Sequence, residues 1–239
     1  SYVRQGVSQV LSRLTFGATL SHLRRIVIPI GKEGKNTQIR QLHGSQIFFI
    51  CLFETPEGHS SGIVKNFSLS CEVTNGVPAS LVREIVENLP QLISIADISV
   101  LTECANTRVY INGNIIGITT DQEELCRVLR DLRDKKRIDT EVSVAYDDID
   151  NEIHIATDGG RLIRPLFHLE DNKIPDIQGD ESWQELIESG KIRYRDPAEL
   201  ENNVVAMCQE NLSQPWNHNL CELHPSLMMG VCASIIPYQ

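Results

Sequence analysis

The sequence lacks the features that mark membrane, secreted and disulfide-stapled proteins. Its longest apolar run covers residues 47–53, whereas crossing a bilayer takes about 20 apolar residues. The first residues show no charged segment followed by an apolar one, so no signal peptide is predicted. The seven cysteines are odd in number and contain no C-x-x-C pair, which argues against a disulfide framework. We therefore expect a soluble, intracellular protein with reduced cysteines and no membrane association.

Aromatic residues are few, at 5%, but the composition is otherwise that of an ordinary globular chain. Apolar residues make up 41% and charged residues 23% of the 239 positions, so extensive disorder is not expected. This length can form one large domain or two small ones around a real core. The chain contains no internal repeat, low-complexity tract or long linker.

Positive charge is scarce in the whole chain but concentrated near its start. The net charge of −10 argues against a general nucleic-acid binder. Residues 1–65 contain eight Lys and Arg against three acidic residues, a balance of +5, which leaves −15 for residues 66–239. This division suggests a first part that approaches a polyanion and an acidic remainder that faces solvent or protein partners.

Local sequence patterns predict a mixed α+β chain. Two short helices are expected between residues 5 and 26, and an apolar strand over Gln46–Phe53. The strongest local signal is a hairpin over 108–118 with an Asn112-Gly113 turn, followed by a helix capped by Asp121. Further helices are expected over 80–87, 181–189 and 197–201, and further strands over 141–145, 152–156 and 162–169.

Three groups of residues invite a chemical interpretation, but none is a specific motif. The loop Gly31–Asn36 contains glycines and lysines without the spacing of a P-loop, so a flexible basic loop is the better interpretation. The acidic cluster Asp147–Glu152 lacks the spacing of a calcium loop and favours a solvated hairpin turn. His218, Cys221 and His224 lack the converging partners that zinc needs. No triad or activated cysteine is recognised either, so these residues alone do not name a function.

A series of longer motifs runs through nearly the whole chain in one order. The motifs are Gly6–Arg13, Thr19–Arg25, Pro29–Gly31, Gly34-Lys35, Arg40–His43, Glu54–Gly58, Gly62–Asn66, Arg108–Gly113, Asp158–Arg161, Arg164–Phe167, Cys221–Ser226 and Gly230–Pro237. In this order they closely resemble the second-largest subunit of multisubunit DNA-directed RNA polymerases, of the eukaryotic RNA polymerase II type. Departures from the family pattern fit a large DNA virus at least as well as a cellular source.

The resemblance implies a fragment, because intact subunits of this family are several times longer. Residues 1–70 then correspond to the fork region with its basic fork loop, residues 71–215 to a mixed domain like the external 2 region, and residues 216–239 to the start of the following core region. The implied fold is α+β, with mixed helices and antiparallel strands. The abrupt end at Gln239 favours truncation, and the family's catalytic acidic motif would lie beyond it, so we expect no catalysis by this chain alone.

The resemblance also places six residues near nucleic acid or nucleotide: Gln9, Lys32, Lys35, Arg40, Gln41 and Glu57. Gln9 matches a fork position, and the two lysines match a fork loop close to the downstream DNA. Arg40 and Gln41 match residues close to the incoming nucleotide and the template. A guanidinium group can stabilise phosphate charge by bidentate contact, and we hypothesise that Glu57 orients Arg40 or a neighbouring base.

The implied function is synthesis of RNA from a DNA template with ribonucleoside triphosphates. The resemblance implies Mg²⁺ in the intact enzyme, bound mainly by the largest subunit, and no metal bound by this fragment. Implied partners are the largest and other polymerase subunits, template DNA, RNA product and nucleotides. The implied location is the nucleus for a cellular enzyme, or a cytoplasmic factory or virion for a viral one. The alternative is a non-catalytic split product or stand-alone module that binds polymerase subunits or nucleic acid.

Overall fold

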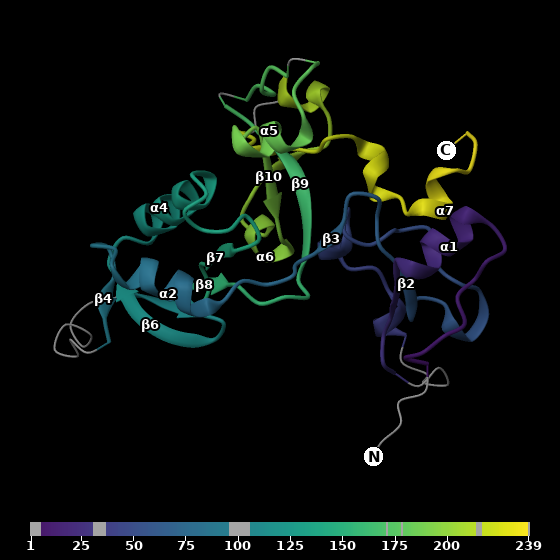
Figure 1. Ribbon diagram of the computed structural model, residues 1–239, viewed down its shortest axis with the longest axis horizontal. Helices are drawn as coiled ribbons and strands as arrows, with labels where there is room; N and C mark the ends of the chain where they lie inside the picture. The colour runs from purple at the N-terminus through teal and green to yellow at the C-terminus, as the bar shows by residue number, and fades with distance from the viewer. Residues whose placement is uncertain are drawn as a thin grey trace. The chain divides into compact units, whose positions relative to one another are not determined.

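The computed structural model describes residues 6–30, 37–95, 106–170, 172–177, 179–213 and 217–238. The chain forms two compact units. The first unit combines Ser1–Cys71 with Pro225–Gln239, and the second unit is Glu72–His224. Both units contain helices and strands, which Figure 1 labels, so the expected α+β class is confirmed.

The first unit is built from short elements. Helix α1 (Phe16–Leu23) begins after Thr15, whose hydroxyl accepts a hydrogen bond from the Ala18 N–H, and leads into strand β1 (Arg25–Val27). β1 pairs antiparallel with β2 (Val64–Asn66). The unit also contains the 3₁₀ turns η1 (Gln38–Arg40), η2 (Gly44–Gln46), η3 (Gly58–Ser60) and η5 (Pro225–Met228), and the short helix α7 (Val231–Ser234).

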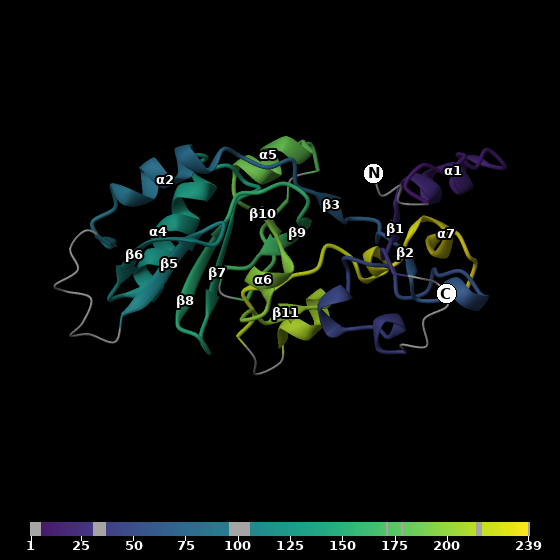
Figure 2. The ribbon, with the colours of Figure 1, turned by 90° about the horizontal axis from the view of Figure 1, so that it is seen from below.

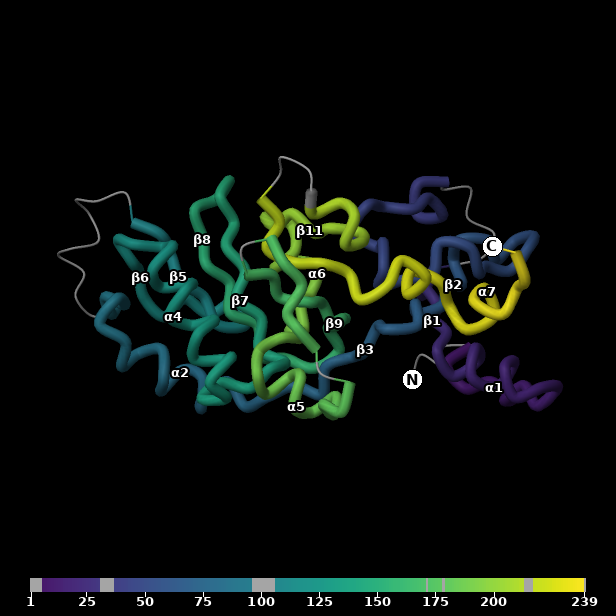
Figure 3. Tube along the Cα trace, turned by 90° about the horizontal axis from the view of Figure 1, so that it is seen from above, coloured from purple at the N-terminus to yellow at the C-terminus, as the bar shows by residue number. Residues whose placement is uncertain are grey.

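The C-terminal segment packs into the first unit. Figure 3 shows α7 beside α1, and the Leu69 N–H donates to the Met229 carbonyl at 2.9 Å. Gly230 precedes α7 at a very close approach, because a Cβ atom there would lie 2.8 Å from Oε2 of Glu54. A larger residue at position 230 would therefore have to displace that carboxylate.

The expected helix before residue 15 is wrong. Residues 7–14 are irregular, and only the second expected helix is present, as α1. The Ser12 N–H donates to Nδ1 of His22 at 3.0 Å, and the Thr19 hydroxyl donates to the Ser12 carbonyl at 2.8 Å. These side chains of α1 take up backbone groups that a helix would have paired internally.

The expected strand over Gln46–Phe53 is also wrong. The N–H groups of Phe49 and Ile50 both donate to the Gln46 carbonyl, and Phe48 has a positive φ of 64°, so the chain turns here. The run still supplies buried apolar side chains. Its hydrophobicity therefore reflects core packing of a turn rather than a strand.

One sheet of the second unit has five strands, and two helices cover one of its faces (Figure 2). The strand order is β4 (Ile93–Ser94), β6 (Asn114–Thr119), β5 (Thr107–Ile111), β8 (Glu152–Ala156) and β7 (Ser143–Asp147). The pair β5–β8 is parallel and the other neighbours are antiparallel. The covering helices are α2 (Ala79–Glu87) and α4 (Gln122–Asp134), which bury Val82, Val86, Leu125 and Leu129 against the sheet.

Local sequence signals in this unit are confirmed. Asn112 and Gly113 join β5 to β6 with φ values of 46° and 80°, the positive pair that a type I′ turn needs. Asp121 caps α4, with its Oδ1 accepting a hydrogen bond from the Glu124 N–H at 3.0 Å. The hairpin and the helix therefore form where local chemistry predicts them.

A second sheet adjoins the first within this unit. Its order is β10 (Ile192–Arg195), β9 (Leu162–His168), β12 (Leu220–Cys221) and β11 (Val205–Ala206), and β3 (Glu72–Val73) also pairs with β9. The helices expected over 181–189 and 197–201 are present as α5 (Trp183–Glu188) and α6 (Pro197–Leu200), and η4 (Gln209–Ser213) follows β11. Ser182 and Glu185 form a reciprocal capping box at the start of α5.

Side chains, rather than another strand, pair with the outer edge of β7 and the residue before it. The Val144 N–H donates to Oε1 of Glu199 at 2.6 Å, and the Val144 carbonyl accepts from Arg130 at 3.1 Å. The Val142 carbonyl accepts from Nη1 of Arg133 at 2.7 Å. Because the arginines come from α4 and the glutamate from α6, this polar edge joins three elements.

Glu199 is also the centre of a buried ion cluster. Its side chain is 1% exposed and lies 2.6 Å from Arg133 and 3.1 Å from Arg195. Burial alone would raise the pKa of this carboxyl, but Arg133 and Arg195 outweigh burial and hold the pKa at about 2. Glu199 is therefore ionised at neutral pH.

Candidate functional site

Arg40 holds the turn that follows the motif Glu54–Gly58. Its Nη1 donates to the carbonyl of His59 at 2.8 Å and to the carbonyl of Ser61 at 2.7 Å. The side chain comes from the last residue of η1, so these bonds join two segments of the first unit. Because two backbone carbonyls orient one planar group, the guanidinium is held in a defined position.

Gly62 and Thr55 close the same turn, which we call the Arg40 clamp (Arg40 with residues 55–62). Gly62 has a φ of +73°, and a Cβ atom there would lie only 2.6 Å from the Arg40 carbonyl oxygen. The Thr55 hydroxyl accepts a hydrogen bond from the Gly62 N–H at 2.9 Å and donates to the Val64 carbonyl at 3.0 Å. The clamp therefore requires glycine at position 62 for both conformation and space.

Glu54 connects this motif to the rest of the unit. Its carboxylate accepts a hydrogen bond from the Ser21 hydroxyl of α1, and its carbonyl accepts from Nδ2 of Asn66 at 3.1 Å. Burial, together with the hydrogen bond to Glu54, raises the pKa of the Cys232 thiol in α7. The sequence drew attention to Glu57, whereas Glu54 makes the contacts to other segments of the unit. The apolar run that ends just before Glu54 contains buried side chains, and it is the sequence signal that could have indicated this role of Glu54.

Gln9 is exposed and docks the N-terminal segment on α1. Its Oε1 lies 3.0 Å from Nε2 of His22, and its Nε2 donates to the Gly6 carbonyl at 2.9 Å. Because Nδ1 of His22 accepts the Ser12 N–H, a neutral imidazole carries its proton on Nε2 and donates it to Gln9. The amide of Gln9 is therefore held in place at the surface.

Of the remaining predicted site residues, two are described by the structure and two are not. Gln41 follows η1 and Glu57 precedes η3, and both are exposed. In the described part of the chain no hydrogen bond or ion pair joins Glu57 to Arg40, so backbone carbonyls orient Arg40 instead. Lys32 and Lys35 lie outside the described residues.

Much of the positive charge of the first unit contacts the unit's own polar groups. Nη2 of Arg24 donates to the carbonyls of Ser68 at 2.6 Å and Cys71 at 2.9 Å. Lys65 is 6% exposed, donates to Oε1 of Gln46 at 3.1 Å, and has a pKa lowered by burial. In the described part of residues 1–65 the exposed arginines are Arg13 and Arg25. The charge count therefore overstates the positive surface of this unit.

The other candidates from the sequence lie in the second unit. The acidic cluster Asp147–Glu152 is the turn between β7 and β8, as expected, with Oδ1 of Asp147 accepting N–H groups of the turn. Cys221 is fully buried in β12, and Glu222 pairs with Arg164.

Over the described ranges, no three His, Cys, Asp or Glu side chains gather as a metal site would require. No helix in those ranges is long and apolar enough to cross a bilayer.

The first unit exposes many large apolar side chains. Near its start Val10, Leu14 and Phe16 are 95%, 89% and 81% exposed. Near its end Ile235 is 72% exposed and Tyr238 is fully exposed. Apolar side chains in such number are rarely left in water, so this surface is suited to be covered by protein.

Two family models match the chain. The model "RNA polymerase Rpb2, domain 3" matches residues 9–73, and the model "RNA polymerase Rpb2, domain 4" matches residues 109–170. Both belong to one subunit and occur in the expected order. The first match contains the Arg40 clamp, and the second contains most of β5, together with β6, α4 and β7–β9.

Similar proteins span cellular and viral sources. The chain is 40% identical to "DNA-directed RNA polymerase II subunit 2" of Arabidopsis thaliana, over 98% of the chain and 22% of that protein. It is 38% identical to "Probable DNA-directed RNA polymerase II subunit RPB2 homolog" of Invertebrate iridescent virus 6, over 100% of the chain and 20% of that protein. It is 37% identical to "DNA-directed RNA polymerase subunit Rpo2" of Sulfolobus acidocaldarius, over 98% and 22%. The chain thus spans about a fifth of the length of these relatives.

Proposed function

Because the chain belongs to the Rpb2 family of RNA polymerase second-largest subunits, we propose that it works as a section of such a subunit. The assembled enzyme would synthesise RNA from a DNA template with ribonucleoside triphosphates. The first unit would line the downstream DNA and the active centre, with Lys32 and Lys35 in a fork loop near the DNA. The section itself would not be catalytic.

The observation that supports this role is the Arg40 clamp within the segment matched to domain 3. The clamp fixes the backbone next to exposed Gln41 and around exposed Glu57. Polar side chains on a rigid backbone can position a phosphate or base without reorganising. In this proposal Arg40 is a positioning residue, and Gln41 contacts the nucleotide or template.

The proposal assigns protein partners to the exposed apolar surface of the first unit. The rest of the subunit and the largest polymerase subunit would cover side chains such as Val10, Phe16 and Ile235. Template DNA, RNA product and nucleotides would meet the unit only in the assembled enzyme. Gln9, held by His22, would be one of the polar side chains near the nucleic acid.

The proposal assigns no metal to this chain. Mg²⁺ of the assembled enzyme would be held mainly by the largest subunit, and would supply the charge neutralisation that phosphoryl transfer needs. The compartment would be the nucleus for a cellular enzyme, or a cytoplasmic factory or virion for a viral one.

Purification of the tagged protein from its native source tests the assembly. We expect mass spectrometry to find the sequence in a polypeptide several times longer, bound to a largest polymerase subunit. A 26.9 kDa species that purifies alone would contradict the proposal and favour a stand-alone or split module.

Variants of the assembled polymerase test the site. Arg40→Ala should slow elongation at saturating nucleotide on the order of tenfold, because loss of the clamp misplaces Gln41. If Arg40 acts through Gln41, the double variant with Gln41→Ala should be no slower than the slower single variant. Arg13→Ala is the control, because it removes an exposed arginine from the same family-matched range, residues 9–73. Additive effects, or equal rates for the Arg40 and Arg13 variants, would contradict the positioning role.

A further inference from the structure

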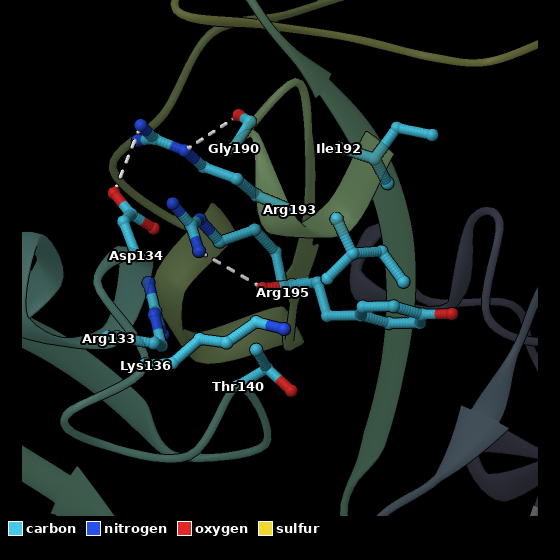
Figure 4. Close-up of a pocket in the computed structure, with 10 residues that line it drawn as sticks. Arg133, Asp134, Lys136, Thr140, Gly190, Ile192, Arg193 and Arg195 are labelled. Atoms are coloured by element: carbon cyan, nitrogen blue, oxygen red, sulfur yellow. Dashed lines mark hydrogen bonds and ion pairs between the residues drawn. The ribbon is translucent and has the colours of Figure 1, made fainter. Parts of the chain in front are cut away.

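A pocket in the second unit is lined by basic side chains from two segments. One segment is the end of α4 with the residues after it, and the other runs from residue 187 to β10. Figure 4 shows the guanidinium groups of Arg133, Arg193 and Arg195 gathered on one side of the pocket, with Lys136 and Thr140 nearby. The family models and relatives assign no ligand to this pocket.

Two of the cations have their own carboxylates. Arg193 lies 3.0 Å from Asp134, and both side chains are about one-fifth exposed. Lys136 lies 2.7 Å from Glu188 at the surface, where both side chains are nearly half exposed. These two pairs are electrically balanced, and the second is accessible to water.

The other two cations share a single carboxylate. Arg133 and Arg195 both contact Glu199, and all three side chains are buried. The four cations that line the pocket are therefore paired with three carboxylates. Counted over these direct ion pairs, one positive charge is in excess, and it is held where water screens it poorly.

Arg195 has a donor that the protein does not use. Its Nε pairs with Glu199 at 3.1 Å, and its Nη1 donates to the Tyr194 carbonyl at 3.0 Å. Among the described residues, Nη2 of Arg195 has no hydrogen-bond acceptor. Burial, and then the neighbouring Arg133, lower the pKa of Arg195 to about 9, so its charge is poorly compensated.

We propose that this pocket binds a small oxyanion, and that its ligand is a phosphate group. Nη2 of Arg195, on a side chain that is 7% exposed, supplies a charged donor at the pocket wall. The Lys136 ammonium and the Thr140 hydroxyl line the same pocket and supply further donors. Phosphate presents several acceptor oxygens and more than one negative charge near neutral pH, which suits a group of donors with excess positive charge better than a single carboxylate does.

Titration of the full chain with inorganic phosphate tests this proposal. Sodium chloride keeps the ionic strength constant, and acetate is titrated in parallel. We expect saturable binding of one phosphate by calorimetry, with a shift of the Arg195 Nε–Hε resonance in NMR spectra. No saturation up to about 50 mM phosphate would overturn the proposal. Acetate binding as tightly as phosphate would overturn the assignment of the ligand.

Variants then place the anion in this pocket. Lys136→Gln and Arg193→Gln should each weaken phosphate binding roughly tenfold, because each removes a positive charge from the lining. Arg127→Gln, on an exposed part of α4, is the matched control and should leave the affinity unchanged. Lys136 is at the surface, so Lys136→Gln keeps the test valid if Arg193→Gln does not fold. Equal affinities in wild type and Lys136→Gln would overturn the placement.

Discussion

Replacing Glu199 by glutamine should strongly destabilise the second unit. The change leaves Arg133 and Arg195 buried without their counter-charge and weakens the bond to the Val144 N–H. The pKa of Glu199 falls from 4.5 to about 2 on folding, a difference that corresponds to about 3 kcal/mol at neutral pH. Removing one partner of a buried ion pair costs roughly 3–5 kcal/mol, which agrees with this figure.

Urea unfolding followed by tryptophan fluorescence measures this effect. Trp183, the first residue of α5, lies in the second unit, so its fluorescence reports on that unit. With a slope of roughly 2 kcal/mol per molar urea, the midpoint of Glu199→Gln should fall by about 1.5 M. Glu188→Gln is the control, because it removes a carboxylate from a surface pair and should change the midpoint little.

The pH dependence provides an independent check on Glu199. Its pKa is lowered on folding, so its stabilising contribution is complete above the ordinary value of 4.5 and is lost as the pH falls toward about 2. The difference in unfolding free energy between wild type and Glu199→Gln should therefore shrink from pH 5 to pH 2. A constant difference over this range, or equal midpoints for the Glu199 and Glu188 variants, would refute the reasoning.

Three further substitutions test local features of the fold. Gly62→Ala should lower the free energy of unfolding by about 1–3 kcal/mol, more than Gly58→Ala does. Both glycines have positive φ, but only a Cβ atom at position 62 would meet the Arg40 carbonyl. Urea midpoints from circular dichroism compare the two variants, and equal losses of stability would contradict the close approach. Asp121→Ala should cost about 1 kcal/mol by loss of the α4 cap, while Asp121→Asn keeps the acceptor and should cost little. Leu129→Ala should cost about 2–5 kcal/mol because Leu129 is fully buried, and a smaller loss by fluorescence-detected unfolding would argue against its place in the core.

Local signals predicted the second unit better than the first. The Asn112-Gly113 turn and the Asp121 cap act over a few residues, so the hairpin and α4 could be predicted without tertiary information. The segment before α1 followed different rules. Its apolar residues have helical spacing, but His22 and Thr19 of α1 form hydrogen bonds with the backbone of Ser12, and the segment is not a helix. No local sequence pattern reveals these contacts.

The candidate site shows the same division. The sequence resemblance drew attention to Arg40, Gln41 and Glu57, but not to the carbonyls of residues 59 and 61 that hold the guanidinium. Charge counting could not distinguish an arginine that faces solvent from one that, like Arg24, binds backbone carbonyls. The packing of α7 beside α1 joins segments more than 200 residues apart and needed the structure.

The polar edge of β7 also affects whether copies of this chain can associate through their sheets. A strand edge with unused N–H and carbonyl groups is a template on which another chain can add its own strand and begin to aggregate. Arg130, Arg133 and Glu199 already occupy these groups around Val144, so a second copy finds no partners there. Local opening of α6 would remove Glu199 and uncover this template while the rest of the sheet remains folded. Self-association would then precede global unfolding.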